Sequence, residues 1–344
     1  MTPTTVRPWR LAVAGCGAAA FGLHLPLLTA SDAFDVIAVA DRDPARARTA
    51  QTRFAVPRTA SGIGDLLADA DVLVILTGVH DSLIEEALDA GVHVVTEKPV
   101  CLDAVRTRKL AARAKDAGLL LEVGAMRAHD PALHAALAHV PEPTGGWLVK
   151  ADGVDEATRR SLLPPGFAPY TFAQDPPQPV PEHLDAHQVT ALQILLWQGY
   201  HLLTALVLAV PGITAAACRL DPAGSSLHAL LEGPAGEPFT LVISATPAGV
   251  FREQIHLADT VEAATIDFAR PYEPAATTQL TTADGTTGGF GDPFAAMWNA
   301  VDARLSGQHP ADLPTSADLA LRVEDLALAL AGLARPGTRT RKDT

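Results

Sequence analysis

Short, continuously apolar segments alternate with Ala-rich helical segments over the first third of the chain, and this alternation constrains the fold most. The expected strands are residues 11–14, 36–40, 72–76, 92–96 and 119–123, and the expected helices are 18–29, 44–53, 82–90 and 102–117. Strands that helices cover on both faces are apolar at every position, as these are. The pattern predicts an α/β domain with a doubly wound parallel sheet.

The chain changes character after Met126, where Pro and Gly become frequent. Residues 215–220, 227–232, 239–245, 254–258 and 264–268 have the composition of successive strands, and helices are expected at 187–210, 293–305 and 316–333. We therefore expect an α/β domain at residues 1–124, an α+β domain with an open antiparallel sheet at 125–336, and a frayed tail at 337–344.

The charge balance argues against some classes of partner. The chain has 26 Lys and Arg against 39 Asp and Glu, a formal net charge of -13, which opposes general binding to nucleic acid or to an anionic bilayer. Its three cysteines, Cys16, Cys101 and Cys218, form no Cys-x-x-Cys pair. Neither a disulfide framework nor a thiolate metal site is predicted, and a cytoplasmic location is expected.

Two apolar stretches have features of membrane signals. Arg7 and Arg10 precede the apolar residues 11–16, as in a secretory signal, but the same residues continue into a glycine loop and a helix. Residues 189–210 are long enough to cross a bilayer, but Gln198 and His201 are among the polar residues that interrupt them. We expect a buried core helix and no membrane association.

A glycine pattern follows the first strand. Gly15, Gly17 and Ala20 form Gly-x-Gly-x-x-Ala, with Cys16 and Ala19 between them. Gly15 permits the tight turn, Gly17 lets the backbone approach a pyrophosphate, and Ala20 keeps helix and strand close. The pattern predicts a dinucleotide-binding loop at the N-terminus of a helix.

Asp41 ends the second strand, where a carboxylate can accept hydrogen bonds from both hydroxyls of the adenosine ribose. It could instead cap the helix that begins at Pro44. Because a 2'-phosphate beside Asp41 would meet like charge, the sequence favours NAD over NADP. Arg42, by stacking on adenine or by offsetting a phosphate together with Arg46, keeps NADP as the alternative.

Three segments together resemble one family. Gly15-Cys16-Gly17, residues 87–94 and Glu97-Lys98-Pro99 closely resemble the glucose-fructose oxidoreductase, inositol dehydrogenase and rhizopine-catabolism (Gfo/Idh/MocA) family. The resemblance implies a Rossmann domain, a second domain with an open sheet, and NAD(P)-dependent hydride transfer to or from a small molecule. The family's substrates include sugars, cyclitols and imines, so the resemblance does not name one.

Lys98 is the expected proton donor or acceptor. It follows a central strand at the edge where open α/β sheets bind ligands, and Pro99 restricts it to an extended backbone and permits a cis bond. A desolvated lysine can exchange a proton with an alcohol or carbonyl. The resemblance implies the same role, and the alternative is a solvated loop lysine.

The resemblance implies further cofactor contacts from Thr77, His80 and Glu97. Thr77 and His80 are expected to line the nicotinamide side, although the loop between them is shorter than in the family. Glu97 resembles the family residue that helps to hold the cofactor. It could instead pair with a basic neighbour.

Residues 196–201 correspond to the family's substrate helix, which usually reads Asp-x-Gly-x-His. Gly199 and His201 are retained, and Trp197 stands where the Asp is expected. Helical spacing places the indole beside His201, with Gln198 as the nearest polar partner. We expect Trp197, Gln198 and His201 to contact substrate, and His201 to be catalytic, with a satisfied core histidine as the alternative.

Arg127 resembles a family residue that faces the substrate, and it could equally pair with Asp130. His183 and His187 have helical spacing with acids between them, which could suit a divalent metal. The acid-rich start of a helix is the favoured interpretation, so no metal is predicted.

The leading hypothesis is an NAD(P)-dependent oxidoreductase acting on a small molecule, and the rival is a non-catalytic nucleotide-dependent binding or regulatory protein. A sheet packed by helices on one face leaves the other to be covered. We therefore also expect a homo-oligomer formed through the C-terminal sheet.

Overall fold

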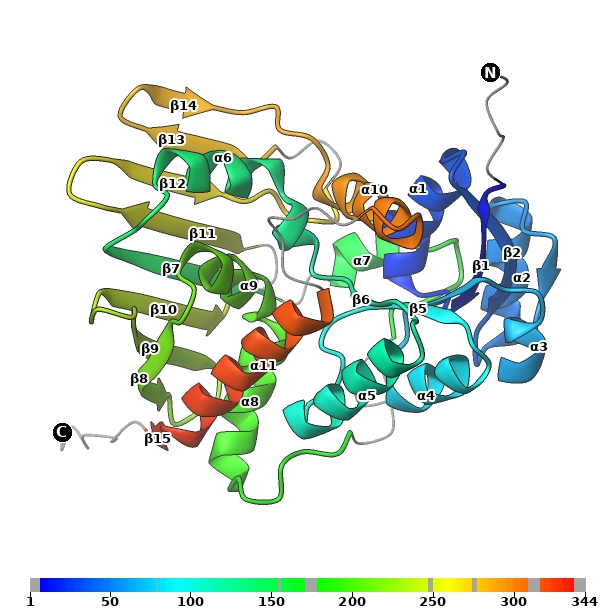
Figure 1. Ribbon diagram of the computed structural model, residues 1–344, viewed down its shortest axis with the longest axis horizontal. Coiled ribbons are helices and arrows are strands. Elements are labelled where there is room, and N and C mark those ends of the chain that lie inside the picture. The colour runs from blue at the N-terminus through cyan, green and yellow to red at the C-terminus, as the bar shows by residue number, and fades with distance from the viewer. Residues whose placement is uncertain are drawn as a thin grey trace.

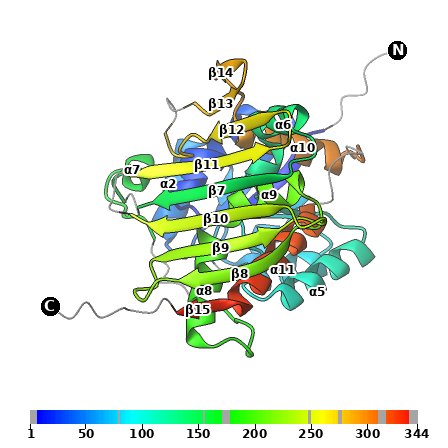
Figure 2. The ribbon, with the colours of Figure 1, turned by 90° about the vertical axis from the view of Figure 1, so that its left-hand side faces the viewer.

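The computed structural model describes residues 7–78, 80–153, 156–170, 178–246, 250–273, 277–308 and 316–336. It has two lobes, each built around one β-sheet (Figure 1). The N-terminal sheet lies between layers of helices, and the C-terminal sheet has helices packed on one face (Figure 2).

The N-terminal sheet confirms the predicted doubly wound α/β fold. Six parallel strands have the order β3-β2-β1-β4-β5-β6. They are β1 (Trp9–Ala14), β2 (Phe34–Ala40), β3 (Arg58–Thr59), β4 (Val72–Ile75), β5 (His93–Thr96) and β6 (Leu121–Val123). The sequence pattern missed β3 because two residues carry no periodicity.

The helices of this lobe are η1 (Ala20–His24), α1 (Leu25–Ala30), α2 (Pro44–Arg53), α3 (Ile63–Leu67), α4 (Asp81–Asp89) and α5 (Ala104–Asp116). The single helix expected at 18–29 is a π-helical turn, η1, followed by α1. Pro26 lies at the start of α1 and has no N–H to donate to the preceding turn, so a continuous α-helix is interrupted there.

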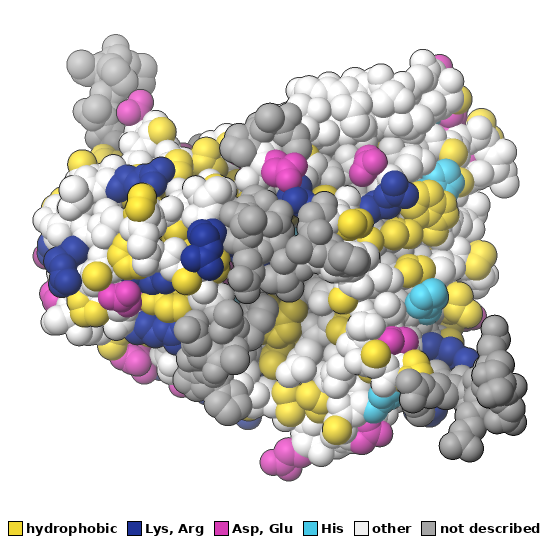
Figure 3. Space-filling model, turned by 180° about the vertical axis from the view of Figure 1, so that it is seen from behind, with side chains coloured by type: hydrophobic (Ala, Val, Ile, Leu, Met, Phe, Trp, Pro, Cys, Tyr) yellow, Lys and Arg dark blue, Asp and Glu magenta, His cyan; other side chains and the backbone are white. Residues whose placement is uncertain are grey.

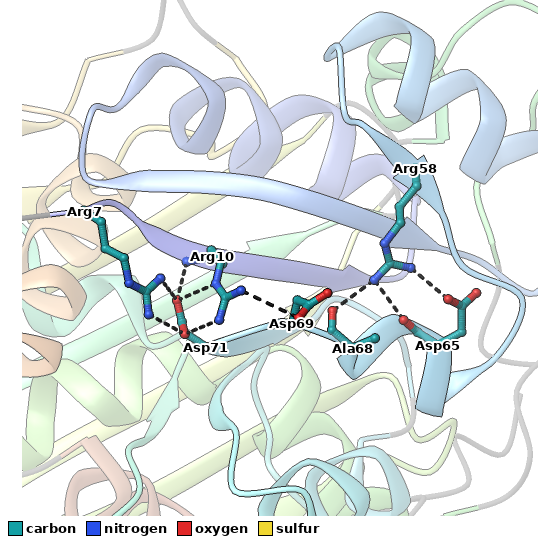
Figure 4. Close-up of polar contacts among 7 residues, drawn as sticks. All are labelled: Arg7, Arg10, Arg58, Asp65, Ala68, Asp69 and Asp71. Carbon is teal, nitrogen blue, oxygen red and sulfur yellow. Dashed lines mark hydrogen bonds and ion pairs between the residues drawn. The ribbon is translucent and has the colours of Figure 1, made fainter.

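Ion pairs join the N-terminal ends of the central strands β1 and β4 (Figure 4). The Asp71 carboxylate accepts hydrogen bonds from the Arg7 side chain at 2.7 Å and from the Arg10 backbone N–H at 2.9 Å. The Arg7 hydrogen bond is the largest cause of a lowered pKa at Asp71. These contacts fix the start of β1 beside β4, although exposed pairs contribute little to stability.

The segment between the sheets contains η2 (Met126–His129), α6 (Pro131–His139), β7 (Gly145–Asp152) and α7 (Glu156–Leu162). The strand β7 runs through the middle of the C-terminal sheet, beside β11 and β10. A Cβ at Gly146 would lie 2.3 Å from the His256 carbonyl oxygen, so this glycine allows β11 to approach. The abundance of Gly and Pro here concealed the strand.

The C-terminal sheet has nine described strands in the order β14-β13-β12-β11-β7-β10-β9-β8-β15. They include β8 (Thr214–Leu220), β9 (Ser226–Glu232), β10 (Pro238–Ala245), β11 (Phe251–Ala258), β12 (Ala263–Asp267), β13 (Gln279–Thr282), β14 (Gly285–Thr287) and β15 (Ala334–Pro336). The antiparallel prediction needs correction at two pairs, because β10 is parallel to β7 and β15 is parallel to β8. Both partners come from outside residues 215–268, where the strands were predicted.

The apolar stretch expected as one helix forms two, α8 (Ala186–Trp197) and α9 (Tyr200–Ala209), which meet at an angle of 73°. At the break, a Cβ on Gly199 would lie 2.6 Å from Ile243 Cδ1. The glycine thus allows the junction to press against β10. No single described helix is long and apolar enough to cross a membrane, although the bent pair passes that test by length and composition.

The last two helices return to the N-terminal lobe, and α11 also packs on the C-terminal lobe. From α10 (Pro293–Leu305), Phe294, Met297 and Trp298 pack into the core of the N-terminal lobe. The helix α11 (Ser316–Gly332) packs against α8 and α9 and also against α5 and β6 (Figure 1). Residues late in the sequence thereby hold the two sheets together.

Candidate active site

The glycine loop joins β1 to η1 at the carboxyl edge of the parallel sheet. Gly15 has φ 101°, and a Cβ there would lie 2.8 Å from the carbonyl carbon of Leu76, so the turn requires glycine. Ala19 is the N-cap residue of η1, and Ala20 is completely buried. This geometry suits the roles predicted for the loop in binding a pyrophosphate.

Asp41 faces the glycine loop. Its Oδ2 accepts the N–H of Cys16 at 2.7 Å, and its Oδ1 accepts the N–H of Asp43 at 2.8 Å and the hydroxyl of Tyr170 at 2.6 Å. The guanidinium carbon of Arg42 lies 4.2 Å from the centre of the Tyr170 ring. Asp43, rather than Asp41, caps α2, so the structure does not support the capping interpretation of Asp41.

Thr77 and His80 follow β4 on the other side of the loop. The Thr77 methyl group lies 3.1 Å from a Cβ built on Gly15. His80 is 2% exposed, and neither ring nitrogen has a hydrogen-bond partner among the described residues. Burial lowers its pKa to about 4, so the ring is neutral at pH 7. Buried polar atoms without partners are what a site awaiting a ligand would show.

Glu97, predicted to hold the cofactor or to pair with a basic neighbour, pairs with His24. The distance from Glu97 Oε1 to His24 Nε2 is 2.9 Å. Burial raises the pKa of Glu97, but its hydrogen bond with His24 and nearby positive charge outweigh burial and leave that pKa lowered. The pair joins the end of β5 to η1, and the geometry favours the second interpretation.

Lys98 lies between the lobes at the end of β5, before a cis peptide bond to Pro99. Its Nζ donates a hydrogen bond to the Trp197 carbonyl oxygen at 2.9 Å, at the C-terminal end of α8. Burial is the largest influence on this lysine and lowers its pKa from 10.5 to about 8, with Glu97 opposing the shift. Lys98 is therefore not the solvated loop lysine of the alternative reading.

The 73° break between α8 and α9 separates Trp197 from His201. Trp197 ends α8 and His201 lies in α9, so they do not share one helix face as expected. His201 Nδ1 and Gln198 Oε1 are buried without hydrogen-bond partners among the described residues. Burial, followed by Lys98, lowers the pKa of His201 well below its usual value, so its imidazole is neutral. The orphaned Nδ1 does not fit the satisfied core histidine of the alternative reading.

Arg127 lies in a buried ionic cluster. Its Nε donates to Glu253 at 3.0 Å and its Nη1 to Asp130 at 2.7 Å, while Lys150 also binds Glu253. Burial raises the pKa of Glu253, but Lys150 and Arg127 outweigh it and hold that pKa low. The structure thus shows the pairing with Asp130 that was the alternative to substrate binding, and Glu253 and Lys150 were not predicted.

Glu324, on α11, holds the loop that follows Lys98 and was not singled out in the sequence. Its Oε1 accepts the Val100 N–H at 3.1 Å, and burial raises its pKa to about 8. A protonated carboxyl group therefore links α11 to the lysine loop at neutral pH. A single Glu in an apolar helix does not predict from sequence that it will bind a backbone N–H such as that of Val100.

The segment predicted not to bind metal begins α8. Asp185 and Gln188 form a capping box there, in agreement with a helix start. Within the described ranges, no group of three or more His, Cys, Asp or Glu side chains could hold a metal ion.

Comparisons with known proteins agree with this geometry. Residues 9–125 match the sequence profile of the Gfo/Idh/MocA family, described as an oxidoreductase family with an NAD-binding Rossmann fold. A myo-inositol dehydrogenase of Streptomyces leeuwenhoekii is 34% identical over 126 residues, which cover 35% of this chain and 38% of that protein. A dTDP-3,4-didehydro-2,6-dideoxy-alpha-D-glucose 3-reductase of Actinomadura kijaniata is 35% identical over 133 residues, 38% of this chain and 40% of that protein. The matched segments span less than half of these relatives.

Solved structures extend the likeness of fold to both lobes. A 3-ketoreductase from Actinomadura kijaniata, in complex with NADP and TDP-benzene, has a TM-score of 0.73 at 23% identity and covers 96% of this chain and 98% of its own. An oxidoreductase from Thermotoga maritima has a TM-score of 0.76 at 21% identity, covering 95% and 97%. Residues 9–125 thus match the NAD-binding Rossmann domain of the Gfo/Idh/MocA oxidoreductase family.

Proposed function

We propose that the chain is an NAD(P)-dependent oxidoreductase that moves a hydride between the nicotinamide and a hydroxyl or carbonyl carbon, with Lys98 exchanging the proton. The bound cofactor would supply or take up the hydride. In reduction, the Lys98 ammonium gives a proton to the carbonyl oxygen as a C–H bond forms at the carbonyl carbon. In oxidation, the neutral amine takes the hydroxyl proton.

The placement of Lys98 carries this proposal. The side chain stands at the carboxyl edge of the parallel sheet, beside the break between α8 and α9, with a pKa lowered to about 8. A group whose pKa lies near the working pH can both donate and accept protons. His201 is neutral, so we assign it hydrogen bonding to the reacting oxygen, with Trp197 and Gln198 beside it.

The substrate proposed is a sugar or cyclitol. The Streptomyces and Actinomadura relatives are named as an inositol dehydrogenase and a sugar 3-reductase. Trp197 at the position where the family usually has Asp favours a less polar biosynthetic ketone or imine as the second candidate. On the face drawn in Figure 3, Lys and Arg side chains are interspersed with acidic and hydrophobic ones.

NAD is the preferred cofactor in this proposal, because Asp41 faces the position expected for the adenosine ribose. Arg42 and Arg46 are close enough to the same site, each near the Tyr170 ring, to keep NADP as the alternative. The Actinomadura 3-ketoreductase structure contains NADP.

We also propose self-association through the helix-free face of the C-terminal sheet (Figure 2). Trp147 and Leu230, 36% and 53% exposed, flank Thr240 in one row across three strands. A monomeric mass by light scattering at micromolar protein would contradict self-association.

The division into domains at 1–124 and 125–336 and the cytoplasmic location stay predictions, and residues 337–344 lie outside the described ranges.

Turnover of Lys98→Met tests the proposal. The variant should bind NADH with nearly unchanged affinity and lose reduction of keto-sugars and inososes, because the ammonium acts in the transition state. Lys109→Met, at an exposed position on α5, is the matched control and should keep turnover. Unchanged turnover in Lys98→Met would contradict the catalytic role. NADH binding by the wild type without hydride transfer to any of these compounds would favour the binding-protein alternative.

A further inference from the structure

Residues 163–170, which follow α7, are anchored on the N-terminal lobe. Leu163 is buried in the core of that lobe, and Phe167 packs against the same core. The Ala168 carbonyl oxygen accepts a hydrogen bond from Arg46. A segment that follows the C-terminal sheet's central strand β7 in sequence therefore lies against the nucleotide-binding lobe.

Tyr170 ends this segment beside the glycine loop. Its hydroxyl donates to Asp41 Oδ1 at 2.6 Å, and its ring lies 3.9 Å from a Cβ built on Gly17. The guanidinium carbons of Arg42 and Arg46 lie 4.2 and 4.1 Å from the ring centre. Burial, followed by the hydrogen bond to Asp41, raises the pKa of Tyr170 to about 12, so the phenol keeps its proton at neutral pH.

A dinucleotide needs these same groups. In a Rossmann domain the acidic residue after the second strand accepts the ribose hydroxyls, and the second glycine lets the backbone approach the pyrophosphate. Arginines that flank an aromatic ring can equally stack on adenine. The Tyr170 hydroxyl thus stands where a ribose hydroxyl would, and its ring lies over the glycine that the pyrophosphate would approach.

We propose that Tyr170 sets the affinity of the nucleotide site by occupying its adenosine half in the free protein, so that the dinucleotide must displace it. The inference rests on the proposed binding of NAD(P). The observed dissociation constant is then the intrinsic constant divided by the fraction of molecules in which Tyr170 has left.

Calorimetric titration with NADH, NADPH and ADP-ribose tests this inference. Tyr170→Phe keeps the ring and removes the hydrogen bond to the Asp41 carboxylate, so all three ligands should bind about tenfold more tightly. The gain in affinity should be the same for NADH and NADPH, because the hydrogen bond between Tyr170 and Asp41 breaks before either ligand binds. Arg160→Ala, at an exposed position in α7, is the control and should bind as the wild type does.

Weaker binding by Tyr170→Phe would overturn the inference, because Tyr170 would then support the bound nucleotide. Equal affinity in variant and wild type would overturn it too, and would leave the proposed function intact. If neither the wild type nor the variants bind NADH or ADP-ribose, the proposed function fails and the inference fails with it.

Limited proteolysis gives a readout that does not depend on affinity. Chymotrypsin can cut after Phe167 and Tyr170, and displacement of Tyr170 should expose both sites. Saturating NADH should therefore speed cleavage of the wild type after Phe167 and after Tyr170, as followed by mass spectrometry. Protection of these sites by NADH would contradict displacement.

Discussion

Replacing Gly199 by alanine tests the packing of the junction between α8 and α9, which positions Trp197 and His201. A Cβ at this position would lie 2.6 Å from Ile243 Cδ1 and 2.9 Å from the Leu195 carbonyl oxygen. Ile243 is fully buried, and the oxygen belongs to the backbone of α8, so neither can move aside freely. The substitution must shift α8 relative to α9 or to β10.

The size of the effect follows from two opposing contributions. Overpacking a well-packed core costs about 1–3 kcal/mol. Gly199 has φ -84°, a conformation that alanine adopts readily, and alanine gains up to about 1 kcal/mol of helix propensity over glycine. We expect the free energy of unfolding to fall by about 1–2 kcal/mol.

Urea unfolding of Gly199→Ala and Gly64→Ala makes the comparison. Gly64 lies inside α3, and a Cβ there meets no atom within 4 Å, so the control should be as stable as the wild type or slightly more stable. A shifted α8 also moves the Trp197 carbonyl oxygen away from Lys98, so turnover should fall with stability. Equal stability of the two variants would refute the close packing of the junction.

Three further predictions concern charge. Asp41→Ser removes the repulsion of a 2'-phosphate and should shift preference from NADH toward NADPH; equal dissociation constants for the two in the native protein would contradict the assignment. Because the pKa of Lys98 is lowered to about 8, ketone reduction should decline above that pH and alcohol oxidation should increase through it; the pH dependence of kcat/KM measures both. Burial raises the pKa of Glu324 to about 8 in the folded protein. The protonated carboxyl group therefore contributes its full stability at pH values below the pKa that Glu324 has in the unfolded chain. This contribution is lost as the pH rises through about 8. Between about pH 5 and pH 8 the thermal midpoint should fall less in Glu324→Gln than in the wild type, and parallel curves would count against this role.

The sequence predicted those features whose residues lie close together along the chain. The glycine loop, Asp41 and the Glu97-Lys98-Pro99 segment each follow a strand of a repeating α/β pattern, so their place at the sheet edge follows from that pattern. The break at Gly199 was missed because glycine inside an apolar run does not by itself distinguish a bend from a continuous helix.

The missed site residues make contacts over long stretches of sequence. Tyr170 bonds to Asp41 across 129 residues, Glu253 to Arg127 across 126, and Glu324 to Val100 across 224. Local periodicity contains no information on such pairs. They depend on how β7, β11 and α11 pack around the parallel sheet.

Transfer of deuterium from NADH labelled at nicotinamide C4 to a keto-sugar, measured by mass spectrometry in a single turnover, tests the central claim most directly. The account predicts that the product from the wild type carries the label at the former carbonyl carbon. It also predicts that Lys98→Met binds the labelled cofactor and transfers no label. Label transfer by Lys98→Met at the wild-type rate, or none by wild-type protein saturated with NADH and a panel of sugar and cyclitol ketones, would contradict it.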